Sequence, residues 1–341
     1  MLKFFWLDIV VLAAGMGFAF FRGEQTGGNG LSFLLSALII AALEISLSFD
    51  NAVINATKLK TMAPIWRRRF LTWGIAIAVF GMRFVFPIAI VSIFSNIPFG
   101  GVLKLALGNP EQYAQYLREA HVGISSFGGT FLMMLFCEFM FADNKNLHWI
   151  SPAEKLLKKV GELKFAPTLV SVACLLAVQP FLGEGQRAVS LAAGFGGIVI
   201  HLLIHGISGK LESLAARRNA FAVKHAGLAA FMYLELIDAS FSLDGVLGAF
   251  ALTRDVVVIA VGLSVGAFFV RSITLVLVEK HTLEKLVFLT HGAYWAIGSL
   301  ALIMLVSTIE EIPELLTGTF GMILILASLA SSILYNKRLN R

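Results

Sequence analysis

Charged side chains are scarce in this chain. Asp, Glu, Lys and Arg together make up 14% of its 341 residues, whereas soluble globular proteins have about 25%. Cysteine is rarer still, because only Cys137 and Cys174 are present and both lie within apolar stretches. This scarcity argues against a disulfide framework and against a thiolate metal site. An ATP-binding signature is also absent, so a nucleotide-driven pump is not expected.

Apolar sequence, by contrast, is abundant. Hydrophobic residues make up 58% of the chain and its mean hydropathy is +0.84, a composition typical of a membrane protein. A helix needs about 20 apolar residues to cross a bilayer, and ten stretches approach or exceed this length. We therefore predict an all-α polytopic membrane protein, with one transmembrane domain over residues 1–341 and no separate soluble domain. The predicted spans are 2–21, 31–55, 70–94, 124–142, 165–183, 188–209, 226–250, 255–278, 292–309 and 315–335.

The first predicted span resembles a secretory signal. It contains Asp8, however, and it lacks a pattern of small residues at which a signal would be cleaved. It is also long enough to cross a membrane by itself. We therefore expect a retained anchor helix.

Lys and Arg are distributed unevenly between the two ends of the predicted spans. Twenty of them fall on one side and five on the other, while Arg83 and Arg271 lie within spans. Because cytoplasmic loops are rich in Lys and Arg, we expect both termini in the cytoplasm. The net charge of +6 is then a sign of membrane topology and of contact with the lipid bilayer. A nucleic-acid partner is not expected.

One polar motif occurs twice within this apolar sequence. Residues 43–51 are matched 194 positions later by residues 237–245. An ionised side chain at such depth in a bilayer costs roughly 2.5 to 3.5 kcal/mol. The presence of acids in the motif therefore indicates a structural or functional role. The corresponding polar positions are Glu44 and Asp238, Ser46 and Ser240, Ser48 and Ser242, and Asp50 and Asp244.

The similarity extends over three consecutive predicted helices. Because the second and seventh spans are five spans apart, the two copies cross the membrane in opposite directions, as in the inverted repeats of secondary transporters. We predict a first repeat over residues 31–142 and a second, inverted repeat over residues 226–309. A chance match between apolar helices is the alternative. Further matching positions are Gly74 and Gly262, Arg83 and Arg271, His121 and His291, and Gly128 and Gly298.

The repeated acids favour a site for a hard cation. Carboxylate, amide and hydroxyl oxygens are the ligands that suit Mg²⁺, Ca²⁺ and Mn²⁺, and two inverted helices would bring up to four acids around one ion. In an unbroken helix Glu44 and Asp50 would lie about 9 Å apart along the axis and on different faces. Either the helix unwinds locally, or each acid serves a different part of one cavity. Gly245 takes the place of Asn51 in the second copy and is expected to loosen its helix. The acids are Glu44, Asp50, Asp238 and Asp244, with Ser48, Ser242, Glu235, Arg83 and Arg271 as supporting residues.

A plainer alternative is that these acids pair with Arg83 and Arg271 and hold the helices together. Two arginines cannot neutralise four acids, so pairing and cation binding are compatible.

Two histidines show the spacing of a zinc-binding pair. His201 and His205 are four residues apart, but the glutamate of an HExxH protease is missing between them. We therefore expect a structural role near the cytoplasmic end of their helix. Glu138 and Asp143 lie near the inner end of the fourth span. We expect them to form an acidic entrance that raises the local concentration of cations.

At Glu44, Asp50 and Asn51 in the first copy, and at Asp238 and Asp244 in the second, the chain resembles the TerC family of integral membrane proteins, in particular its longer bacterial branch of unknown function. The family is associated with tellurite resistance, and several relatives are understood as manganese exporters. The resemblance covers residues 31 to 335 and implies that the family's acidic motif falls on these five residues. It also implies a bacterial plasma (inner) membrane location. Gly245 departs from the small hydroxyl residue often found after the second aspartate.

Three functions compete. The first is a secondary transporter that exports a divalent cation, Mn²⁺ or second Ca²⁺, with Glu44, Asp50, Asn51, Asp238 and Asp244 as ligands. The second is a membrane scaffold or stress-response protein with structural acids. The third is an intramembrane hydrolase that would use His201, His205 and the acids. It is disfavoured because the sequence contains neither a nucleophile motif nor the HExxH glutamate. We therefore expect no enzyme activity and no organic cofactor, and the sequence identifies no protein partner.

Overall fold

Helices account for the whole of the regular structure. The computed structural model describes residues 2–339 except 143, 144, 146, 164, 217–219, 281 and 311, and within a few helical stretches, including 241–244, it describes only the backbone. The described residues contain no strand. This agrees with the composition, because a chain in lipid must satisfy its backbone N–H and C=O groups within each helix.

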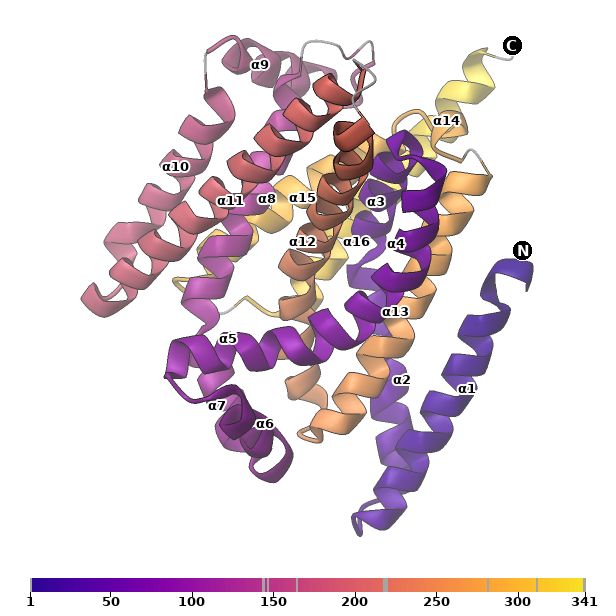
Figure 1. Ribbon diagram of the computed structural model, residues 1–341, viewed down its shortest axis with the longest axis vertical. Coiled ribbons are helices and arrows are strands. Elements are labelled where there is room, and N and C mark those ends of the chain that lie inside the picture. The colour runs from indigo at the N-terminus through magenta and orange to yellow at the C-terminus, as the bar shows by residue number, and fades with distance from the viewer. Residues whose placement is uncertain are drawn as a thin grey trace.

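The helices are arranged as a bundle, and most of them run along its long axis (Figure 1). In the first part of the chain they are α1 (Leu2–Gln25), α2 (Gly30–Leu47), α3 (Phe49–Thr61), α4 (Pro64–Ala76), the π-helical segment η1 (Ile77–Val85), α5 (Phe86–Ser95), α6 (Phe99–Gly108), α7 (Pro110–Glu119) and α8 (His121–Phe141). In the second part they are α9 (Ser151–Gly161), α10 (Ala166–Val178), the short 3₁₀ turn η2 (Gln179–Phe181), α11 (Glu184–Ala216), α12 (Ala220–Leu252), α13 (Val256–Glu279), α14 (Thr282–Lys285), α15 (Leu289–Ser307) and α16 (Glu314–Leu339).

Eight stretches of described helix are long and apolar enough to cross a membrane, and a ninth is added if the bent pair α9 and α10 counts as one span. The prediction of an all-α multi-pass membrane protein is therefore confirmed. The predicted fifth span, 165–183, is wrong as a continuous helix. Its α-helix has only 13 residues and ends in the 3₁₀ turn that contains Pro180, because proline cannot continue an α-helical hydrogen-bond ladder.

Two other predicted spans are interrupted where polar side chains lie. The span 31–55 is divided at Ser48, whose backbone (φ −99°, ψ 14°) lies outside the helical region between α2 and α3. In the span 70–94, residues Ile77–Val85 form a π-helix instead of an α-helix. Such segments are rare and are often found at functional sites.

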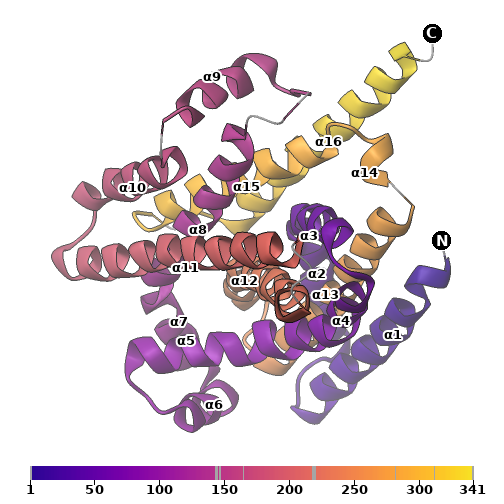
Figure 2. The same ribbon diagram turned by 45° about the horizontal axis from the view of Figure 1, so that its top comes forward.

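The packing of the two predicted repeats is reciprocal. In each repeat the first helix contacts the second helix of the other: α2 packs on α13, and α12 packs on α4 and η1. The third helices, α8 and α15, pack on each other, and they run in opposite directions through the bundle (Figures 1 and 2). A side chain at Gly128 would overlap Met304, and one at Gly298 would overlap Phe136. These equivalent glycines therefore permit the close approach of α8 and α15. The assignment of an inverted repeat remains a prediction.

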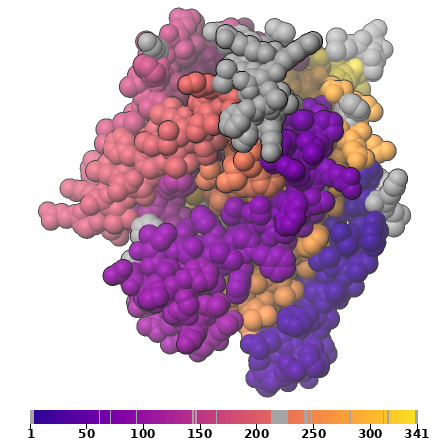
Figure 3. All heavy atoms as spheres, in the orientation of Figure 1, coloured from indigo at the N-terminus to yellow at the C-terminus, as the bar shows by residue number. Residues whose placement is uncertain are grey.

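α1 lies at the outer edge of the bundle, beside α13 (Figure 3). A side chain at Gly15 would meet Val265 and Val261 of α13, so the glycine allows the two helices to pack closely. Asp8 of α1 is 1% exposed. The predicted anchor helix is therefore packed against the rest of the protein along one side.

The buried Glu154 attaches α9 to the bundle. Its carboxylate is fully buried and accepts hydrogen bonds from His291 Nδ1 at 3.0 Å, from Trp295 Nε1 at 3.2 Å and from the backbone N–H of Ile150 at 3.3 Å. Burial alone would raise the pKa of Glu154, but these hydrogen bonds outweigh it and lower the pKa to about 2. His291 at the start of α15 thus holds α9 in place through its bond to Glu154.

We predict that Glu154→Gln destabilises the protein by roughly 2–4 kcal/mol, because it removes a buried charge that accepts several hydrogen bonds. Since the pKa of Glu154 is lowered from 4.5 to about 2, its contribution is complete above pH 4.5 and is lost as the pH falls toward 2. Thermal unfolding of the purified protein in detergent, measured between pH 7 and pH 3, tests this. The exposed Glu162 provides the control, and Glu162→Gln should unfold like the wild type; equal stability of the two variants would contradict the prediction.

Candidate cation site at the centre of the bundle

The first acid of the repeated motif forms a buried ion pair with an arginine of its own repeat. Glu44 lies in the last turn of α2 and is 2% exposed, and Arg83 of η1 is 6% exposed. Arg83 Nη2 donates to Glu44 Oε1, which also accepts from Ser48 Oγ at 3.0 Å. The other terminal nitrogen of Arg83 donates to the carbonyl oxygen of Ala78 at 3.1 Å. Two of the predicted supporting residues, Ser48 and Arg83, are therefore in contact with Glu44.

The equivalent pair forms in the second repeat. Arg271 Nη2 of α13 lies 3.2 Å from Asp238 Oδ2 and 3.4 Å from Glu235 Oε1, both on α12. The guanidinium also donates to the carbonyl oxygens of Phe70 at 2.9 Å and Gly74 at 2.8 Å, and it stacks over the Phe70 ring. A side chain at Gly74 would overlap Arg271 and Glu235, so this glycine makes room for the pair.

Two asparagines of α3 join the repeats at Asp238. Nδ2 of Asn51 lies 2.5 Å from Asp238 Oδ1, and Nδ2 of Asn55 lies 3.0 Å from the same oxygen. Because an ionised carboxylate only accepts hydrogen bonds, both amides must turn their nitrogens toward it. Their oxygens are consequently left buried without a hydrogen-bond partner, as is Glu235 Oε2. Asn55 was not predicted as a site residue, although an amide one helical turn after Asn51 in an apolar helix indicates one.

Asp50 has a different environment from the other described acids. It lies in the first turn of α3, is 5% exposed, and accepts a hydrogen bond from the backbone N–H of Asn51 at 2.8 Å. Among the described side chains, no Lys or Arg pairs with it. Asp50 and Glu44 both line a cavity of about 30 Å³, which is large enough for about two water molecules. Its other lining residues include Ser46, Gly245, Thr317 and Gly321.

These positions answer the question that the helix geometry left open. The helix does break between Glu44 and Asp50, at Ser48, and the two acids do face one cavity. The expectation for Gly245 was wrong, because α12 continues through this residue as a regular helix. A Cβ at Gly245 would lie 2.9 Å from Glu44 Oε2, so the glycine leaves space for the carboxylate.

Some predicted polar residues do not join the site. The hydroxyls of Ser46 and Ser240 donate to the backbone of their own helices, at the carbonyl oxygens of Ala42 and Leu236. The side chains of Ser242 and Asp244 lie outside the part of the structure that is described. The described polar residues form two ion-paired groups, Glu44 with Arg83, and Glu235 and Asp238 with Arg271. Asn51 and Asn55 bond to Asp238, whereas Asp50 shares a cavity with Glu44 that neither Glu235 nor Asp238 lines.

Comparison with known proteins identifies one family. A family model described as "Protein of unknown function (DUF475)" matches residues 49–339. The matched region contains Asp50 and both arginines, and Glu44 lies five residues before it. No curated protein and no solved structure matches the chain. The resemblance to the TerC family remains a prediction.

We predict that Arg83→Gln destabilises the protein by about 3–5 kcal/mol, because it leaves Glu44 as a buried charge without its partner. The double variant Glu44→Gln, Arg83→Gln removes both charges and should regain most of that stability. Unfolding of the wild type and both variants in detergent, followed by loss of monodisperse protein on heating, measures the difference. A double variant that is no more stable than Arg83→Gln would show that the two side chains do not act as a pair.

Proposed function

We propose that this chain, which belongs to the family described as protein of unknown function (DUF475), is a secondary transporter of the bacterial inner membrane that exports a divalent metal cation. Mn²⁺ is the first candidate and Ca²⁺ the second, because both are hard ions that prefer oxygen ligands. The proposal extends the predicted resemblance to the TerC family, some of whose members are understood as manganese exporters.

One observation carries this proposal. Around Asp238, three buried oxygen atoms have no hydrogen-bond partner among the described residues: Oδ1 of Asn51, Oδ1 of Asn55 and Oε2 of Glu235. A buried acceptor without a partner costs about 1–3 kcal/mol, and a cation is the partner that an oxygen-only group of this kind would satisfy.

The charges of the site agree with this function. Glu44, Asp50, Glu235 and Asp238 are buried with only Arg83 and Arg271 to compensate them. If all six groups are ionised, the described site carries a net charge of −2. A divalent cation would neutralise it, and so would protons when the ion has left.

In the proposed cycle, the ion exchanges its water for the oxygens of Glu44, Asp50, Asn51, Asp238 and Asp244. Rocking of the two repeats would then expose the site to one side of the membrane at a time. The interruption of the helix between Glu44 and Asp50 supports this, because secondary transporters commonly bind ions at broken helices near the middle of the membrane. An ion gradient or the membrane potential would supply the energy.

The second candidate function is a membrane scaffold or stress-response protein with structural acids. One observation favours it: both buried arginines already pair with acids of their own repeat. In that case the site is a cross-link between helices, and no ion passes through the protein.

We predict that the wild-type protein, reconstituted in sealed vesicles, transports Mn²⁺ faster than Ca²⁺ and does not transport Mg²⁺ at a comparable rate, since Mg²⁺ loses its water reluctantly. Asp50→Asn should lower the Mn²⁺ flux roughly tenfold or more, because it removes the charge that no described cation compensates. Asp244→Asn tests the equivalent acid of the second repeat. A fluorescent indicator trapped in the vesicles reports the flux.

Asp8→Asn is the matched control for these variants. Asp8 is also a buried acid, at 1% exposure, but it lies on α1 outside the site, so this variant should keep the wild-type flux. Absence of flux of any of the three ions through wild-type protein, or full flux in both Asp50→Asn and Asp244→Asn, would favour the scaffold.

A further inference from the structure

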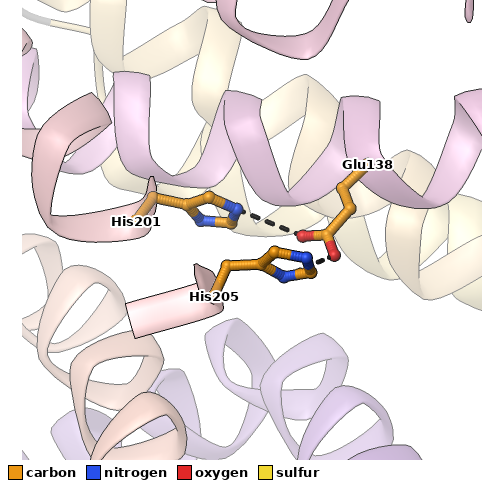
Figure 4. A group of neighbouring side chains, drawn as sticks. All are labelled: Glu138, His201 and His205. Atoms are coloured by element: carbon orange, nitrogen blue, oxygen red, sulfur yellow. Dashed lines mark hydrogen bonds and ion pairs between the residues drawn. The ribbon is translucent and has the colours of Figure 1, made fainter. Parts of the chain in front are cut away.

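A second group of metal-ligating side chains lies apart from the central site. Glu138 belongs to the last turn of α8, and His201 and His205 occupy successive turns of α11. Both imidazole rings point toward the Glu138 carboxylate (Figure 4). His201 Nε2 lies 3.1 Å from Glu138 Oε2, and His205 Nδ1 lies 2.7 Å from Glu138 Oε1. A carboxylate from a neighbouring helix thus lies beside both histidines.

The two helices that carry these residues are held in a fixed register. Ser126 Oγ of α8 lies 2.8 Å from Ser190 Oγ of α11, and Thr130 Oγ1 donates to the carbonyl oxygen of Gly194 at 2.8 Å. A side chain at Gly197 would overlap the Phe127 carbonyl oxygen, so the backbones approach closely there. A site built from two locked helices is positioned more precisely than one built on loops.

The distances suit a metal ion as well as they suit hydrogen bonds. One ligand atom from each residue can be chosen so that all three lie within 4.8 Å of one another. A tetrahedral ion with bonds of about 2.0–2.2 Å holds its ligand atoms roughly 3.4 Å apart. Small side-chain movements would therefore admit an ion between the carboxylate and the rings. Two imidazoles and one carboxylate, with a fourth position open, form a common ligand set for Zn²⁺.

His201 forms the buried side of the group. This histidine is 2% exposed, and its ring packs against the rings of Phe131 and Tyr233. Among the described residues, its Nδ1 has no hydrogen-bond partner, and neither has the buried hydroxyl of Tyr233.

The group is open on one side. The side chain of His205 is 55% exposed and that of Glu138 is 32% exposed, while His201 closes the buried side. An ion would therefore reach the group without passing through the core of the protein. None of the three residues belongs to the central site, which is built from other helices.

We propose that Glu138, His201 and His205 form a second metal site, selective for a transition metal of the Zn²⁺ class, with a solvent molecule as the fourth ligand. The ligand chemistry separates it from the central site, because nitrogen ligands favour Zn²⁺ whereas an all-oxygen set favours Mn²⁺ or Ca²⁺. The proposal does not depend on transport by the central site.

Binding of Co²⁺ and Zn²⁺ to the purified full-length protein tests this site. Protein in detergent is stripped with EDTA and titrated with Co²⁺, whose visible absorption is intense when it is four-coordinate, and Zn²⁺ is then added as a competitor. We expect one Co²⁺ per chain to give this spectrum and Zn²⁺ to displace it. His205→Gln, Glu138→Gln and His201→Gln should each lower the affinity tenfold or more, since even loss of an outer-sphere partner costs about 10- to 100-fold.

His121→Gln is the matched control, because His121 lies on α8 at the opposite end from Glu138 and bonds to Ser125. It should bind Co²⁺ like the wild type. Asp50→Asn should also keep the Co²⁺ spectrum, which separates this site from the central one. His205 is the most exposed of the three ligands, so His205→Gln remains informative if the buried variants fail to fold, as judged by gel filtration.

A wild-type protein without the four-coordinate Co²⁺ spectrum would overturn the proposal and leave the three side chains as a structural contact between α8 and α11. Unchanged affinity in His205→Gln would overturn it as well. So would loss of the spectrum in Asp50→Asn alone, because the ion would then lie at the centre of the bundle.

Discussion

The central fact of this structure is the compensation of buried charge. Four acids lie in the interior of a helical bundle whose surroundings are apolar, and such groups persist only when other charges or hydrogen bonds stabilise them. Glu44 with Arg83, and Asp238 with Arg271, form equivalent pairs in the two halves of the chain. Several local features of the helices make room for these pairs or position them. The π-helical segment carries Arg83, and Gly74 and Gly245 leave space for charged groups that a larger residue would displace.

The compensation is incomplete at one position in the described site. Asp50 has no described cation beside it, and three oxygens near Asp238 have no hydrogen-bond partner. Two buried arginines thus accompany four buried acids in the described part of the structure. Ion pairing and cation binding are compatible in this arrangement, because an ion pair that holds helices together would also hold the remaining oxygens in place for a ligand.

The sequence was sufficient for the architecture and for part of the site. Hydropathy predicted an all-α membrane protein, and the polar repeat identified Glu44, Asp238 and both arginines, which the structure joins as two ion pairs. The break at Ser48 remained one of two alternatives, and the π-helix was not predicted, because a single serine or a short apolar segment is compatible with a continuous α-helix. Glu138 could not be joined to His201 and His205 from the sequence. The contact depends on how α8 and α11 pack, and residues more than 60 positions apart carry no periodic signal for it.

The two halves of the bundle differ in one respect that bears on energetics. The first helix of the first half is interrupted at Ser48, whereas its counterpart α12 is continuous through the equivalent position. If the break moved from the first half to the second, the bundle would have a second arrangement. In it α12 would be interrupted, and α2 and α3 would form one continuous helix. Asn51 and Gly245 differ, so no symmetry would require the two arrangements to have equal free energy. Where their free energies differ, conversion would be faster toward the more stable arrangement.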